Sequence, residues 1–179
     1  MEISKIFENK SLKSKALTEF LASNIQNKSI EISELLKFSE SSNDTKKATC
    51  IEAIEFVTKT NPAILNLESL TKIINYFGEK APRIKWESAK VIGNTIHLYP
   101  ELIAVATSKL LNNIEKQGTV VRWSTAFALS EILKLKTDFN KALIPVVEQI
   151  VQNEEKNSIK KIYLTAFKKI KSEKKGLLK

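Results

Sequence analysis

Apolar residues recur every three or four positions along most of the chain, the spacing that places them on one face of an α-helix. In residues 83–98, this spacing is followed by Trp86, Ala89, Ile92 and Ile96. No segment alternates apolar and polar residues with the period of two that a half-buried strand shows. The pattern therefore predicts an all-α protein.

Turn residues between the apolar stretches separate the predicted helices. Pro62, Pro82 and Pro100 are each expected to open a helix, because proline lacks the N–H that would be unpaired there. Pro145 lies inside a predicted helix and is expected to kink it. The nine predicted helices span residues 10–25, 29–41, 45–60, 66–78, 83–98, 101–116, 120–136, 139–154 and 158–172. The sequence also leaves room for a short turn at residues 2–8.

Four helical segments resemble one another and indicate an internal repeat. They cover residues 49–56, 85–92, 122–129 and 162–167. The segments are 36, 37 and 40 residues apart when they are aligned on Ala53, Ala89, Ala126 and Ala166. A period of this length, built from helix pairs, is typical of a solenoid in which each unit buries its apolar face against its neighbours.

This organisation predicts one domain, residues 1–179, which forms an α-α superhelix of about four helical hairpins. Residues 1–43 are interpreted as a degenerate first repeat, because the repeated segment is not recognisable there. Residues 156–179 are interpreted as a basic C-terminal cap, since a terminal repeat needs one polar face that no neighbour covers.

Two of the repeated segments resemble the second helix of HEAT-type repeats, which are close relatives of armadillo repeats. Residues 83–93 (RIKWESAKVIG) and 120–129 (VVRWSTAFAL) share an early arginine, an alanine one turn later and an apolar continuation. Pro145 is similar to the proline often found in the first helix of that family. The resemblance covers about residues 44–170 and implies a right-handed solenoid whose concave side, lined by second helices, binds a partner. The early arginine is absent from the first and last segments, so a continuous arginine ladder is not expected.

The resemblance places a candidate binding surface on the concave face. Its five candidate residues are Arg83, Trp86, Lys90, Arg122 and Trp123. Both tryptophans lie on apolar helical stripes, which favours packing in the core over a role as an aromatic binding platform. For both arginines, an ion pair with an acid of an adjacent turn is favoured over contact with a ligand.

A DNA-binding function is the alternative. The chain is also similar to the HEAT-like alkylpurine DNA glycosylases, which hold DNA in a basic concave groove with tryptophan, arginine and a catalytic aspartate. The two tryptophans and two arginines named above would supply the aromatic and cationic groups. One turn after each tryptophan, where an acid would be expected, stand Lys90 and Phe127. This resemblance therefore implies a DNA-binding relative without catalysis, and no catalytic residue is predicted.

The net charge of +9 is concentrated at the C-terminal end. Residues 156–179 contain nine lysines and one acid, a net charge of +8, which leaves +1 for residues 1–155. The basic end is interpreted as a solvated cap, with contact to nucleic acid and attachment to an anionic surface as alternatives. Its candidate patch consists of Lys160, Lys161, Lys168, Lys169 and Lys171.

The chain has one cysteine and one histidine, which excludes an internal disulfide, a cysteine-based zinc site and a multi-histidine metal site. Cys50 is interpreted as a buried, inert thiol, and His97 as a residue at a helix C-terminus that can bind free carbonyls. Glu154 and Glu155 are predicted to be solvated surface residues. Neither a glycine-rich phosphate loop nor a nucleophile elbow occurs, so no metal or cofactor is expected.

The sequence thus predicts a non-enzymatic binding module that holds a protein or peptide on its concave face. That face is expected to come from the helices at residues 45–60, 83–98 and 120–136. The N-terminus lacks the apolar stretch of a secretory signal, and the apolar runs are far shorter than the ~20 residues of a membrane span. A cytoplasmic protein is therefore expected, and the degenerate first repeat and the basic last helix, which would cap the two ends, predict a monomer.

Overall fold

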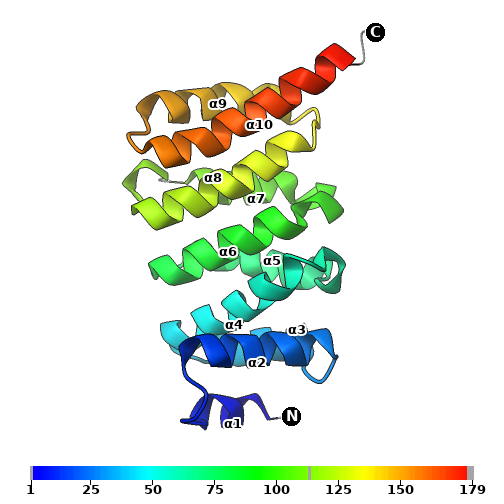
Figure 1. Ribbon diagram of the computed structural model, residues 1–179, viewed down its shortest axis with the longest axis vertical. Coiled ribbons are helices and arrows are strands. Elements are labelled where there is room, and N and C mark those ends of the chain that lie inside the picture. The colour runs from blue at the N-terminus through cyan, green and yellow to red at the C-terminus, as the bar shows by residue number, and fades with distance from the viewer. Residues whose placement is uncertain (1, 113, 177–179) are drawn as a thin grey trace.

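The computed structural model describes residues 2–112 and 114–176, and all regular elements in these ranges are helical (Figure 1). The all-α prediction is confirmed. The α-helices are α1 (Ile3–Glu8), α2 (Ser14–Gln26), α3 (Ile32–Glu40), α4 (Asp44–Thr58), α5 (Leu67–Tyr76), α6 (Pro82–Thr95), α7 (Ile103–Leu111), α8 (Thr119–Lys134), α9 (Asn140–Asn153) and α10 (Asn157–Gly176). Short 3-10 turns lie between some of them: η1 (Pro62–Ile64), η2 (Ile96–Leu98), η3 (Pro100–Leu102) and η4 (Ile114–Lys116).

Each predicted helix corresponds to one of α2 to α10, and the short turn at residues 2–8 is α1. Pro82 is the first residue of α6, as predicted. Pro62 and Pro100 instead open the 3-10 turns η1 and η3, and the α-helices that follow begin at Leu67 and Ile103, one and two residues after their predicted starts. The helix α9 continues through Pro145.

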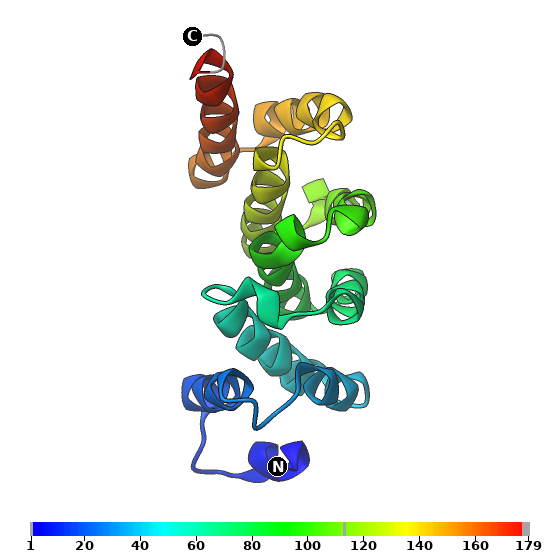
Figure 2. The same ribbon diagram turned by 90° about the vertical axis from the view of Figure 1, so that its right-hand side faces the viewer.

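The helices form two layers that run the length of the molecule (Figure 2). The inner layer consists of α2, α4, α6, α8 and α10, each packed against the next in this order. The outer layer consists of α3, α5, α7 and α9. In Figure 2, α2 and α10 stand farther from the outer layer than the helices between them, so the inner layer lines a concave side. The two ends of the chain lie at opposite ends of the stack (Figure 1).

The alanines that define the sequence repeat lie where inner helices meet their neighbours. Ala53, Ala89 and Ala126 are fully buried. The helices α6 and α8 come especially close at Gly93, where an added Cβ would lie 2.4 Å from Cε1 of Phe127. Small residues at these positions therefore allow successive inner helices to pack closely.

Candidate functional site

Basic residues near the start of the inner helices link each helix to the connection that opens the next inner helix. In each case the donor is the fourth residue of its helix, and the acceptor lies 32 residues later. The three contacts are Lys47 to Glu79 at 2.8 Å, Lys85 to Gln117 at 3.2 Å and Arg122 to Glu154 at 2.9 Å. We refer to these contacts as the cross-helix ladder.

The cross-helix ladder fixes which residues are equivalent in successive inner helices. Its donors are spaced by 38 and 37 residues, so the alignment on alanines misplaces the first segment by two residues. Arg122 is equivalent to Lys85, in agreement with the sequence alignment of residues 85–92 with residues 122–129. Trp86 and Trp123, which follow Lys85 and Arg122, do occupy equivalent positions.

Arg122 and Glu154 form the most buried contact of the ladder. The Glu154 side chain is only 4% exposed, so the prediction that this residue is solvated is wrong. Arg122 also donates from Nη1 to the Gln117 carbonyl at 2.7 Å. Burial works to raise the pKa of the Glu154 carboxyl, but the Lys156 backbone N–H and the Arg122 guanidinium together hold it below its ordinary value. Arg122 thus joins successive repeats, and each of its three guanidinium nitrogens donates a hydrogen bond within the protein.

Arg83 pairs across two inner helices. Its Nη2 lies 2.6 Å from Oε2 of Glu52 on α4, and the same oxygen accepts a hydrogen bond from Thr18 on α2 at 3.0 Å. The predicted ion pair is therefore present, although its acid belongs to a neighbouring helix and not to an adjacent turn of the same helix. Arg122 likewise pairs with an acid outside its own helix, Glu154 at the end of α9.

Lys90 lies between two buried carboxylates. Its Nζ is 3.3 Å from Oε2 of Glu55 on α4 and 2.9 Å from Oε2 of Glu87 on its own helix. Oε1 of Glu87 also accepts a hydrogen bond from the Trp86 indole at 2.6 Å. Glu55 has a second cation, Lys59, at 3.6 Å. These side chains form a continuous ionic network over α4 and α6.

Burial raises the pKa of Glu87, and the Lys90 ammonium and Trp86 N–H only partly offset it. Burial alone would lower the pKa of Lys90, but the charges and hydrogen bonds of Glu87 and Glu55 raise it instead. The three carboxylates Glu52, Glu55 and Glu87 match the three cations that contact them. The concave side of α4 and α6 is therefore neutralised internally, and its candidate cations are not free to bind an anion.

The helix α8 presents apolar side chains to solvent. Val120 and Trp123 are 53% and 43% exposed, and their spacing of three residues places them on the same face. The other sides of α8 pack against α6, α10 and the outer layer, so this face belongs to the concave side. The prediction that Trp123 packs in the core is wrong. Trp86 is half-buried, and the two tryptophans do not stack on each other.

The candidate lysines of α10 surround a buried apolar stripe. The stripe consists of Ile159, Tyr163, Ala166 and Ile170. Lys161, Lys168, Lys169 and Lys171 are exposed and Lys160 is half-buried. Among the side chains that the structure describes, which end at Ser172, no carboxylate forms an ion pair with any of these five lysines. They differ in this respect from Arg83, Lys90 and Arg122.

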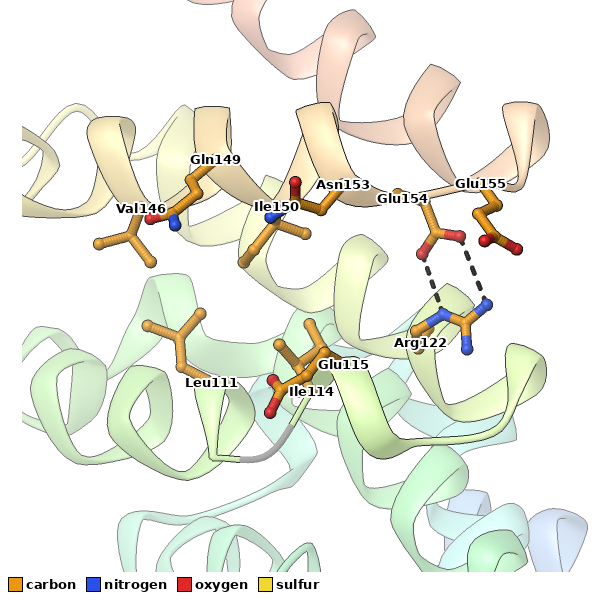
Figure 3. Close-up of a pocket in the computed structure, with 10 residues that line it drawn as sticks. All are labelled: Leu111, Ile114, Glu115, Arg122, Val146, Gln149, Ile150, Asn153, Glu154 and Glu155. Carbon is orange, nitrogen blue, oxygen red and sulfur yellow. Dashed lines mark hydrogen bonds and ion pairs between the residues drawn. The ribbon is translucent and has the colours of Figure 1, made fainter.

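A pocket of about 610 Å³ lies next to the Arg122–Glu154 contact, between α9 and the residues at the end of α7 and in η4 (Figure 3). Leu111, Ile114 and Ile150 supply apolar walls, and the Arg122–Glu154 pair closes one end. Figure 3 shows the two hydrogen bonds from Arg122 to Glu154, which leave that carboxylate satisfied. The described residues that line the pocket include no serine, threonine, cysteine, histidine or lysine.

The single cysteine and the single histidine of the chain lie on different elements. Cys50 is buried, as predicted, and burial raises the pKa of its thiol to about 12. His97 is exposed in η2, directly after α6. The part of the chain that the structure describes contains no group of three or more His, Cys, Asp or Glu side chains arranged to hold a metal ion.

In the described residues, no helix combines the length and the apolar composition needed to cross a membrane. Comparisons with protein-family models, with curated proteins and with solved structures find no match to this chain.

Sequence reasoning missed the acids that neutralise the concave side. Glu55 lies in an otherwise apolar stretch, residues 53–57, and this was the available signal that it is buried. Glu87 has Lys85, Ser88 and Lys90 nearby in sequence, so no local signal indicated its burial. It also missed Val120, whose exposure depends on which of the two apolar faces of α8 the neighbouring helices cover.

Proposed function

We propose that the protein is a non-enzymatic binding module that holds a protein or peptide segment on the concave side of its inner layer. The observation that carries this proposal is the exposed pair Val120 and Trp123 on α8. Adjacent apolar side chains left open to solvent favour contact with another molecule. Tryptophan is also among the residues that contribute most binding energy in protein interfaces.

We also propose that the helical stack is a HEAT-type α-α superhelix. Two observations support this: the two-layer order of the helices, and the cross-helix ladder with its spacings of 38 and 37 residues. In such an architecture each repeat contacts only its neighbours, and the concave side offers an extended surface to a partner.

The DNA-binding alternative is less well supported. A duplex is held by cations that reach successive phosphates, and its affinity depends strongly on salt. Arg83 and Lys90 are engaged by carboxylates, and Arg122 by Glu154. The unpaired lysines of α10 are the observation that favours nucleic acid, and a salt titration of binding to duplex DNA tests it.

Affinity capture followed by mass spectrometry tests the protein-binding proposal. The baits are the wild-type protein, Trp123→Ala and the control Val105→Ala, which removes a side chain of 42% exposure from α7 in the outer layer. We expect a partner that the wild type and Val105→Ala retain and Trp123→Ala loses. The proposal fails if folded Trp123→Ala captures the same proteins as the wild type.

A further inference from the structure

The concave side has two halves of different chemistry. On α4 and α6, each cation that contacts the ionic network is matched by a carboxylate. On α8, Val120 and Trp123 are exposed apolar residues, and α10 exposes lysines without a carboxylate partner together with the apolar Leu164. The ionic network between inner helices thus covers α4 and α6, whereas α10, which packs against α8 with its exposed tryptophan, has an excess of positive charge.

One lysine of α10 holds the same position in its helix as that tryptophan holds in α8. Lys160 is the fourth residue of α10, as Lys85 and Arg122 are of their helices. Lys161 therefore occupies the position held by Trp86 on α6 and Trp123 on α8. Lys168 follows seven residues later, two turns along the same side of the helix.

We propose that the concave surface of α8 and α10 binds an acidic peptide segment that carries a bulky apolar residue. The proposal rests on the binding function proposed above and specifies the chemistry of the partner. Val120 and Trp123 contact the apolar residue, and Lys161 and Lys168 bind carboxylates on either side of it. Lysine ammonium groups form charge-assisted hydrogen bonds with carboxylates, and such complementarity selects the partner and speeds its association.

The Trp123 indole adds a specific polar contact. Its N–H makes no hydrogen bond within the described part of the chain, whereas the N–H of Trp86 is bound by Glu87. A free indole donor beside an apolar surface can bind a backbone carbonyl or a carboxylate of the peptide. The two equivalent tryptophans therefore have different roles, one within the network and one at the surface.

An acidic peptide fits this surface better than a nucleic acid does. On α6 and α8, Arg83, Lys90 and Arg122 are held by carboxylates, so the exposed lysines of α10 do not continue into a track along a phosphate backbone. The exposed Val120 side chain is apolar and cannot form a hydrogen bond with a sugar or a phosphate.

Fluorescence polarisation with three labelled peptides of equal length tests the proposal. Each carries a central Leu-Phe pair, flanked by glutamates, glutamines or lysines. We expect the glutamate peptide to bind the wild-type protein at least about tenfold more tightly than the glutamine peptide. We expect Trp123→Ala, and separately Lys161→Glu with Lys168→Glu, to weaken that binding about tenfold or more.

The matched charge control is Lys37→Glu with Lys80→Glu, which changes the net charge equally at two exposed lysines away from α10. We expect it to alter affinity less than about twofold. An equal loss in this control would reduce the effect to general charge attraction and overturn the proposal. So would the absence of binding by any of the three peptides to the folded protein.

Two further outcomes distinguish failure of the acidic-peptide proposal from failure of the proposed binding function. Equal affinity for the glutamate and glutamine peptides, still dependent on Trp123, overturns the acidic partner and leaves the proposed peptide-binding function intact. Tighter binding of a single-stranded or duplex oligonucleotide, dependent on Trp123 and the two lysines, overturns both in favour of nucleic acid.

Discussion

Replacing Lys90 by methionine removes the ammonium group that two buried carboxylates share while keeping most of the apolar stem. The Glu55 and Glu87 side chains are 6% and 4% exposed, and Lys90 itself is 25% exposed. Removing one partner of a buried ion pair costs about 3–5 kcal/mol, because the other charge is left buried and unpaired. Partial exposure of Lys90 and the remaining contact of Glu55 with Lys59 reduce this to about 2–3 kcal/mol.

The loss should depend on pH in a defined direction. A carboxyl whose pKa is higher in the folded state than in the unfolded state destabilises the fold above the folded pKa. This destabilisation disappears as the pH falls below the ordinary value of 4.5. Glu87 already has a raised pKa, and removal of Lys90 raises it further. The deficit of Lys90→Met relative to wild type should therefore be largest near neutral pH and shrink as the pH approaches 4.5.

Thermal unfolding followed by far-ultraviolet circular dichroism measures the effect. A loss of about 2–3 kcal/mol lowers the Tm of a chain of this size by about 4–12 °C. The control is Lys141→Met, whose lysine pairs with Asp138 at 3.1 Å on the exposed surface and whose Tm should equal that of wild type. An unchanged Tm for Lys90→Met at neutral pH, or a deficit that does not narrow with falling pH, would refute the reasoning.

Two further substitutions test the packing of the inner layer by chemical denaturation. The Tyr163 hydroxyl is buried without a hydrogen-bond partner among the described residues, so Tyr163→Phe should raise the free energy of unfolding by about 1 kcal/mol. Tyr76→Phe removes a hydroxyl that is hydrogen-bonded to Ser39, so it should lower the free energy of unfolding by a similar amount. A change of the same sign in Tyr163→Phe and Tyr76→Phe would contradict this account. Gly93→Ala should lower the free energy of unfolding by about 1–2 kcal/mol, because the new Cβ would clash with Phe127. Gly118→Ala meets no atom within 4 Å and should change it by less than about 0.5 kcal/mol; a neutral Gly93→Ala would show that α6 and α8 are not closely packed.

The helices could be predicted from the sequence because their apolar residues repeat every three or four positions, and this local pattern survives in the fold. Their ends could be predicted less well. Pro62 and Pro100 form 3-10 turns before the next helix, and a missing N–H suits either type of helix start. The register between repeats was misplaced by two residues because several buried positions in each inner helix are small, so the alanines alone did not define one alignment.

The candidate site depended on contacts between residues distant in sequence. Nothing local to Glu154 signals that it is buried; its burial follows from Arg122, which is 32 residues away. Trp86 and Trp123 have the same apolar surroundings in sequence, yet one is half-buried beside Glu87 and the other is exposed. Periodicity identifies the apolar stripes of a helix, but the arrangement of neighbouring helices decides which part of a stripe is covered.

Site-specific photo-crosslinking tests the central claim, that the concave side of α8 is the binding surface, most directly. A benzophenone amino acid is placed at Val120 on α8 or, as a control of similar exposure, at Val105 on α7. After irradiation of cells that express each variant, we predict a protein adduct at position 120 that disappears when Trp123→Ala is added, and none of comparable yield at position 105. Adducts at position 105 without any at position 120, or nucleic acid as the species captured at position 120, would contradict the claim.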